Sequence, residues 1–199
     1  MRKQQIIVAI VITFGAFVAI FEAMKPDRSL LRFEIIGGKA YGFGHTDDRS
    51  VHQISQFLSD HPEIDTLVFK SMSGTVDADQ NLKIARNIRQ RGLNTHLDGN
   101  SFIASGAVDL FLAGQTRTMD CGARIGVHRW SYGKGTDPVK EGWDPRKKHH
   151  ERFLSEMGID PAFYDFIKQA APPTSMYILT SKDINRFGLL TTPTKCKGF

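Results

Sequence analysis

Hydrophobic and polar positions along the chain form blocks that switch between strand and helix periodicity. Residues 30–36 and 39–43 are short runs rich in β-branched and aromatic residues, and Gly37-Gly38 separates them, which predicts a hairpin. Residues 48–58 place apolar side chains at helical spacing, and residues 66–69 (TLVF) then predict a buried strand. The first part of the chain therefore predicts the order β-β-α-β.

Strand and helix patterns continue to alternate in the middle of the chain. The expected elements are, in order, a turn at residues 71–74, a helix at 78–91, a strand at 93–97, a helix that ends at residue 113 and a strand at 124–128. Asn100 or Ser101 is the expected cap of the second helix, so Ser105 is expected in its first turn. This alternation predicts right-handed βαβ crossovers and a largely parallel sheet, and hence an α/β fold.

The last third of the chain predicts a loop followed by helices. Residues 131–145 are rich in Gly, Asp, Lys and Pro and predict an exposed loop, after which helices are expected at residues 146–157, 161–169 and 181–187. The basic run at residues 146–152 is interpreted as a solvated helix face, with a contact to anionic lipid as the alternative.

The N-terminus has the pattern of a targeting or anchoring segment. Residues 6–21 carry no charge and follow a short basic start. The apolar run, extended to residue 24, falls between the core of a signal peptide and a membrane span of about 20 residues. Bulky Phe21 lies two positions before Ala23, which disfavours a signal-peptidase site. Residues 1–24 are therefore expected to be a signal anchor, with a cleaved signal peptide as the alternative.

This layout predicts that the remaining chain works outside the cytoplasm. Residues 25–199 are expected to form a single domain in the periplasm or another extracytoplasmic space, held to the membrane through residues 6–24. A chain of 199 residues with 41% hydrophobic residues is long enough for one such domain with a sizeable core.

The charge, the cysteines and the histidines limit which partners, metals and cofactors the chain is expected to bind. The net charge of +5 comes without a clustered basic stripe, so no nucleic-acid partner is expected. Cys121 and Cys196 are too few for a disulfide scaffold or a zinc site, and a single bridge and two unpaired thiols both stay open. Adjacent His149 and His150 point to different sides of a helix, so no metal site is expected, and no cofactor is implied.

Three segments together suggest acyl-transfer chemistry, which needs a nucleophile, a base and backbone N–H groups aimed at the oxyanion. Ser105 lies among small neighbours at the start of a helix. The turn at residues 71–74 follows a predicted strand, at the carboxyl edge where parallel α/β sheets bind ligands. His128 ends a later strand, at the same edge.

These segments resemble those of the Clp protease proteolytic subunit. Lys70-Ser71-Met72-Ser73-Gly74-Thr75-Val76 is similar to that family's Asn-Ser-Pro-Gly-Gly-Ser-Val turn. Ala104-Ser105-Gly106-Ala107 is similar to its nucleophile segment, and Ile125-Gly126-Val127-His128 is similar to its histidine strand. The resemblance covers residues 32–190. An N-terminal signal combined with an A-S-x-A helix and a G-V-H-R strand resembles a poorly characterised exported branch of the ClpP/crotonase superfamily.

The resemblance implies a ClpP/crotonase-like ββα spiral and assigns roles to four residues. Ser105 is the implied nucleophile, His128 its general base, and the N–H groups of Ser73 and Gly106 the oxyanion hole. The chain departs from the family at Ser73, which stands where the family has glycine.

A second departure concerns the residue that orients the histidine. The family's triad aspartate falls at Met176, which cannot orient an imidazole, so the third triad member is unknown. Thr174, Ser175 and Asp109 are the polar candidates.

The expected function is that of a membrane-anchored or exported serine hydrolase, similar to a peptidase, that acts on a peptide or another acyl substrate. The alternative is a non-catalytic binding or assembly module that keeps the fold without a complete triad, and a homo-oligomer is a further open possibility. Acyl-CoA chemistry of the crotonase branch is disfavoured, because Ser73-Gly74 stands in place of an Ala-x-x-Asp-like motif.

Overall fold

The computed structural model describes residues 30–131, 144–194 and 196. Within them, strands form one mixed sheet in the order β1-β2-β3-β5-β7-β8, and β4 joins β3 to β6. The outer pairs β1-β2 and β7-β8 are antiparallel, and the inner pairs are parallel. The α/β class and the largely parallel sheet are therefore confirmed.

The strands are β1 (Arg32–Ile36), β2 (Lys39–Thr46), β3 (Thr66–Thr75), β4 (Asn94–Leu97), β5 (Phe102–Ala104), β6 (Arg117–Met119), β7 (Arg124–Val127) and β8 (Tyr177–Ile178). The helices are α2 (Ser50–Asp60), α3 (Ala78–Gln90), α4 (Gly106–Leu112), α5 (Lys147–Glu156), α6 (Ala162–Ala170) and α7 (Ser181–Arg186). The predicted hairpin and the helices corresponding to α2, α3, α5, α6 and α7 are confirmed.

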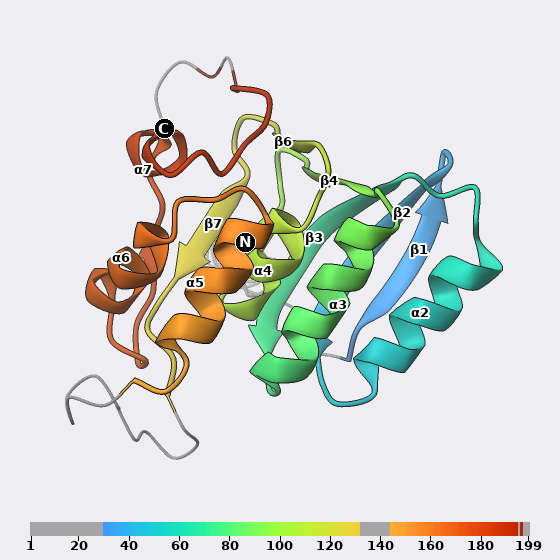
Figure 1. Ribbon diagram of the computed structural model, residues 1–199. Coiled ribbons are helices and arrows are strands. Elements are labelled where there is room, and N and C mark those ends of the chain that lie inside the picture. The colour runs from blue at the N-terminus through green and yellow to red at the C-terminus, as the bar shows by residue number, and fades with distance from the viewer. Residues whose placement is uncertain (1–29, 132–143, 195, 197–199) are drawn as a thin grey trace, which may run out of the picture.

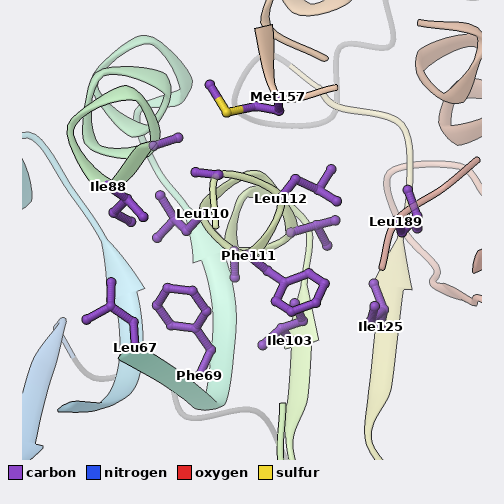
Figure 2. Packing of buried hydrophobic residues seen from close by; sticks show 14 of the residues in the cluster. Leu67, Phe69, Ile88, Ile103, Leu110, Phe111, Leu112, Ile125, Met157 and Leu189 are labelled. Carbon is purple, nitrogen blue, oxygen red and sulfur yellow. The ribbon is translucent and has the colours of Figure 1, made fainter. Parts of the chain in front are cut away.

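The helices cover the sheet and close its core. Helices α2, α3 and α4 lie side by side on one face, and α5 packs against α6 near β7 (Figure 1). Phe69 of β3, Ile103 of β5 and Phe111 of α4 are fully buried where α4 meets the sheet (Figure 2). Burial of each such side chain contributes about 1.5–3 kcal/mol, so this contact helps to hold α4 on the sheet.

The predicted turn at residues 71–74 was wrong. The chain stays in β3 to Thr75, and β3 forks, because Thr66–Val68 pairs with β4 whereas Ser71 and Met72 pair with β5. The register against β2 skips Lys70 and Ser73, so bulges bend the strand there. The sequence contains residues typical of a turn, but it does not indicate that these residues lie within a strand that has two bulges.

The predicted helix start near Asn100 was also wrong. Residues 102–104 form strand β5, which lies between β3 and β7, and α4 begins only at Gly106. A short apolar run fits either type of element, and here pairing on both sides decides for a strand. Ser105 is consequently the N-cap of α4 rather than a residue of its first turn.

A disulfide joins Cys121, in the loop before β7, to Cys196 near the C-terminus, with Cα atoms 5.5 Å apart. The alternative left open by the sequence is thus decided in favour of the bridge. Residues 1–24, predicted to anchor the chain, lie outside the described residues. Among the helices that are described, none combines the length and apolar character needed to cross a membrane.

Candidate active site

A cavity of about 250 Å³ opens beyond the carboxyl ends of β3, β5 and β7. Its lining combines the predicted nucleophile and base with charged and aromatic side chains. The residues are Thr75, Val76, Ala78, Ser105, Gly106, Val108, Asp109, Val127, His128, Trp130, Ser131, Arg146, His150, Tyr164 and Ile167. Ser105, Gly106 and His128, predicted from separate segments, therefore share one cavity.

Ser105 has an unusual backbone conformation. Its φ of 54° is the only positive φ of a non-glycine residue within the described ranges. The residue joins β5 to α4, and its N–H donates to the Gly126 carbonyl of β7 at 3.0 Å. A side chain in this region of φ costs about 1–3 kcal/mol and persists only where the surroundings enforce it. Nucleophilic serines of α/β hydrolases lie on strained strand-to-helix turns of this kind.

Gly74 is the residue of the β3 bulge that packs against Ser105. Its φ is +121°, and a Cβ added there would lie 2.9 Å from Ser105 Cβ and 3.3 Å from Gly106 N. Only glycine fits such a contact in such a conformation. Ser73, predicted as an oxyanion donor, is the preceding residue and is half-buried.

Gly106 follows Ser105 in equally close surroundings. A Cβ there would lie 2.4 Å from Thr75 Cγ2 and 3.1 Å from Asn81 Nδ2. Because Gly106 is the first residue of α4, its N–H has no partner within the helix. The backbone after Ser105 is thus held tightly, with an N–H at the position proposed for an oxyanion donor.

His128 follows β7 and is half-buried. Its Nδ1 lies 2.8 Å from the Arg129 carbonyl, which can only accept, so Nδ1 carries the proton and Nε2 keeps its lone pair. Burial lowers the pKa of His128 below its usual value, and the bond to Arg129 opposes this only in part. His128 is thus a neutral imidazole with one nitrogen available as a base.

The third triad position holds no carboxylate. Val127 pairs with Tyr177 in the β7-β8 ladder, so the chain preceding β8 does run beside His128. Met176 packs on Gly126, where an added Cβ would meet its Cγ at 2.8 Å. His128 Nδ1 is held by the Arg129 carbonyl rather than by Thr174 or Ser175.

Helix α5 contributes a wall that sequence reasoning missed. The basic run at residues 146–152 was interpreted as a solvated face, yet Arg146 and His150, one turn apart, both line the cavity. His150 Nε2 lies 3.1 Å from Asp109 Oδ1, so Asp109, a candidate partner of His128, lies beside another histidine. The signal was the i, i+4 spacing of these two residues beside buried Phe153.

A polar network joins α5 to the neighbouring aromatic side chains of the cavity. Trp130 Nε1 donates to Tyr164 Oη at 2.8 Å, and that hydroxyl donates to Asp144 at 3.0 Å. The Arg146 guanidinium lies 4.5 Å from the centre of the Trp130 ring. These contacts fix aromatic surface and a positive charge at one end of the cavity.

Comparisons with known proteins support the fold. No protein-family model and no curated protein matches this sequence. Among solved structures, a membrane-bound stomatin-specific protease is similar with a TM-score of 0.51 at 13% identity, covering 77% of this chain and 75% of its own. The chain has a ClpP/crotonase-like fold. An enoyl-CoA hydratase from Thermoplasma volcanium (TM-score 0.52, 12% identity, 81% and 70% covered) and methylmalonyl CoA decarboxylase (0.52, 12%, 83% and 68%) share it.

A fold that carries both a protease and CoA-dependent enzymes does not select a reaction. The cavity itself is therefore the guide to function, and its lining includes Ser105 as a candidate nucleophile and His128 as a candidate base.

Proposed function

We propose that the chain is a serine hydrolase, similar to a peptidase, in which Ser105 is the nucleophile and His128 the general base. The observation that carries the proposal is the strained backbone of Ser105, which lines the same cavity as His128. A structural serine gains nothing from a positive φ, whereas a nucleophile gains an exposed Oγ.

The proposed chemistry follows from the groups that line the cavity and from the tautomer of His128. Ser105 Oγ attacks the acyl carbon of a peptide or ester while His128 Nε2 accepts its proton. Collapse of the tetrahedral intermediate then breaks the bond from the acyl carbon to the leaving amine or alcohol, which departs with a proton from an acid of the cavity, and an acyl-enzyme remains. The N–H groups of the Ser73–Gly74 segment and of Gly106 stabilise the oxyanion. Water then attacks the acyl carbon and gives a proton to the conjugate base of that acid, and Ser105 leaves with the proton from His128 as the carboxylic acid product is released.

The missing carboxylate limits the expected rate. The Arg129 carbonyl fixes the tautomer of His128, which is one role of a triad aspartate, but as a neutral dipole it stabilises the imidazolium less than a carboxylate. Turnover by this enzyme should therefore be modest.

We also propose that the domain works outside the cytoplasm as a member of an exported branch of the superfamily, anchored through residues 6–24. The Cys121–Cys196 disulfide supports this, because such bridges persist in oxidising compartments and are rare in the cytosol. A C-terminal alkaline phosphatase fusion should be active, and an inactive fusion beside a working cytoplasmic reporter would reverse the topology.

The function is tested by covalent labelling with a fluorophosphonate, which reacts with activated serines and releases fluoride. We expect stoichiometric labelling of the peptide containing Ser105 by mass spectrometry, and none in Ser105→Ala. Ser131, which also lines the cavity, gives the matched control Ser131→Ala, which should label like the parent. A folded wild type that does not label would instead support a non-catalytic binding or assembly module.

The pH dependence of labelling follows from the lowered pKa of His128. The rate requires the neutral imidazole, so it rises with pH through the pKa of the folded protein. Because burial moves that pKa below its usual value of about 6.5, the half-maximal rate should lie below pH 6.5. A midpoint above this pH, or the same profile in His128→Gln, would contradict the assignment of the base.

A further inference from the structure

The cavity contains a second imidazole, and this one has a carboxylate beside it. His150 of α5 and Asp109 of α4 approach to 3.1 Å between Nε2 and Oδ1, and their side chains are only 19% and 12% exposed. Nε2 is buried and forms no hydrogen bond within the described residues. The two atoms are thus close enough for an ion pair but are not aligned for a hydrogen bond. Catalytic contacts in ligand-free sites are often loose in this way.

Asp109 is tied to the backbone that carries the nucleophile. Asn81 is completely buried in α3 and donates from Nδ2 to the Gly106 carbonyl at 2.7 Å and, more weakly, to Asp109 Oδ2 at 3.4 Å. Thr46 Oγ1 donates to Asn81 Oδ1 at 2.9 Å, which fixes the amide's orientation. One buried amide therefore positions both the Ser105 turn and the carboxylate beside His150.

The other surroundings of His150 are aromatic or cationic. The Tyr164 ring of α6 lies 5.0 Å away and the Phe153 ring 5.7 Å away, centre to centre. Arg146 precedes His150 by one turn of α5 and lines the same cavity, as does His128. Among these groups, Asp109 is the counter-ion for a protonated His150.

We propose that His150, oriented by Asp109, is the acid that protonates the leaving group in the reaction at Ser105; this rests on the proposed serine-hydrolase function. Ser105 Oγ bonds to the acyl carbon and its proton moves to His128. The bond from the acyl carbon to the leaving nitrogen or oxygen then breaks, and that atom takes the proton of the His150 imidazolium.

Deacylation returns both histidines to their first state. Water bonds to the acyl carbon while its proton moves to His150, and Ser105 leaves with the proton from His128. The division suits the two environments, since His128 is held neutral with a free acceptor nitrogen whereas His150 lies next to a carboxylate. It also gives a role to Asp109, the only carboxylate among the described residues that line the cavity, while no carboxylate stands at the expected triad position, Met176.

Leaving-group dependence separates the two histidines without knowledge of the substrate. Two phosphonate diesters that share a methyl ester and differ only in the leaving aryl group, 4-nitrophenyl and phenyl, both form the same bond to Ser105. Nitrophenolate departs without a proton, whereas phenolate needs more assistance. We expect His150→Gln to slow labelling by the phenyl ester by about a hundredfold, in the range of general acid catalysis, and to change the rate of the nitrophenyl ester less than threefold.

The controls separate this role from structure and from the function itself. His149→Gln, an exposed change on the adjacent residue, should alter neither rate, and His128→Gln should slow both. Asp109→Asn should shift the ratio of the two rates in the same direction as His150→Gln, by a smaller factor. If His150→Gln slows both esters equally or neither, at an unchanged melting temperature, the acid role is wrong. Failure of the wild type to react with either ester would refute the hydrolase proposal.

Discussion

We expect Arg117→Met to lower the free energy of unfolding by about 4 kcal/mol, because buried hydrogen-bond acceptors left unsatisfied cost about 1–3 kcal/mol each. Arg117 of β6 is only 5% exposed. Its guanidinium donates to the carbonyls of Leu189 at 2.8 Å and of Gly114 and Met157 at 3.2 Å each. Methionine has an apolar stem but no donor for the Leu189 and Gly114 carbonyls, whereas the Met157 carbonyl keeps its bond from Arg89 Nη2 at 2.7 Å.

The effect should be large because the C-terminal ends of three helices meet at this one side chain. Gly114 follows α4, Met157 caps α5 and Leu189 follows α7. Burial lowers the pKa of Arg117 to about 10, with the nearby charge of Arg89 a smaller cause, so the side chain stays charged at neutral pH. The carbonyl dipoles compensate the buried charge of the guanidinium. When the guanidinium is removed, carbonyls that it bonded stay buried without that donor.

Arg91→Met is the matched control for this stability prediction. Arg91 also makes three hydrogen bonds, to Asn87, Leu58 and Ser59, but it is exposed to solvent. Water replaces those partners, so the loss should stay below about 1 kcal/mol in urea unfolding followed by circular dichroism. Equal losses in the two variants would show that Arg117 does not hold the three segments together.

The alternation of strands and helices was predictable because each long element carries its own periodicity. The pattern in residues 78–91 predicted α3, whose apolar face is buried as expected. Strands β6 and β8 were missed because they span three and two residues, too few for a period of two to be visible. Such strands exist only through pairing with distant neighbours, which one sequence does not reveal.

The residues of the site that could be predicted lie in local motifs, and those that could not depend on contacts between distant segments. Ser105 and His128 were found because each lies in a recognisable short segment. The pairing of His150 with Asp109 was missed, because it depends on how α5 packs beside α4. The sequence also placed a serine and a glycine side by side at residues 73 and 74, without indicating that Gly74 is the one that touches Ser105.

We expect Gly74→Ala to reduce fluorophosphonate labelling of Ser105 by about 10²–10³, the usual cost of losing an oxyanion donor. The added methyl group would meet Ser105 Cβ at 2.9 Å and the Ala104 carbonyl at 3.2 Å, so either β3 or the Ser105 turn must move. The backbone at φ +121° also becomes strained, at a cost of about 1–3 kcal/mol in stability. The two effects have to be separated.

Gly38→Ala separates them, since it imposes a positive φ on alanine where nothing is in contact. Gly38 lies in the hairpin between β1 and β2 with φ +76°, and an added Cβ there has no atom within 4 Å. Its variant should lose stability in thermal unfolding but label at the parental rate. If Gly74→Ala folds and also labels at that rate, the β3 bulge does not shape the oxyanion site, and stabilisation must come from Gly106 and groups outside that bulge. Loss of labelling in Gly74→Ala alone, measured well below both melting temperatures, would instead tie the activity to the contact between this glycine and Ser105.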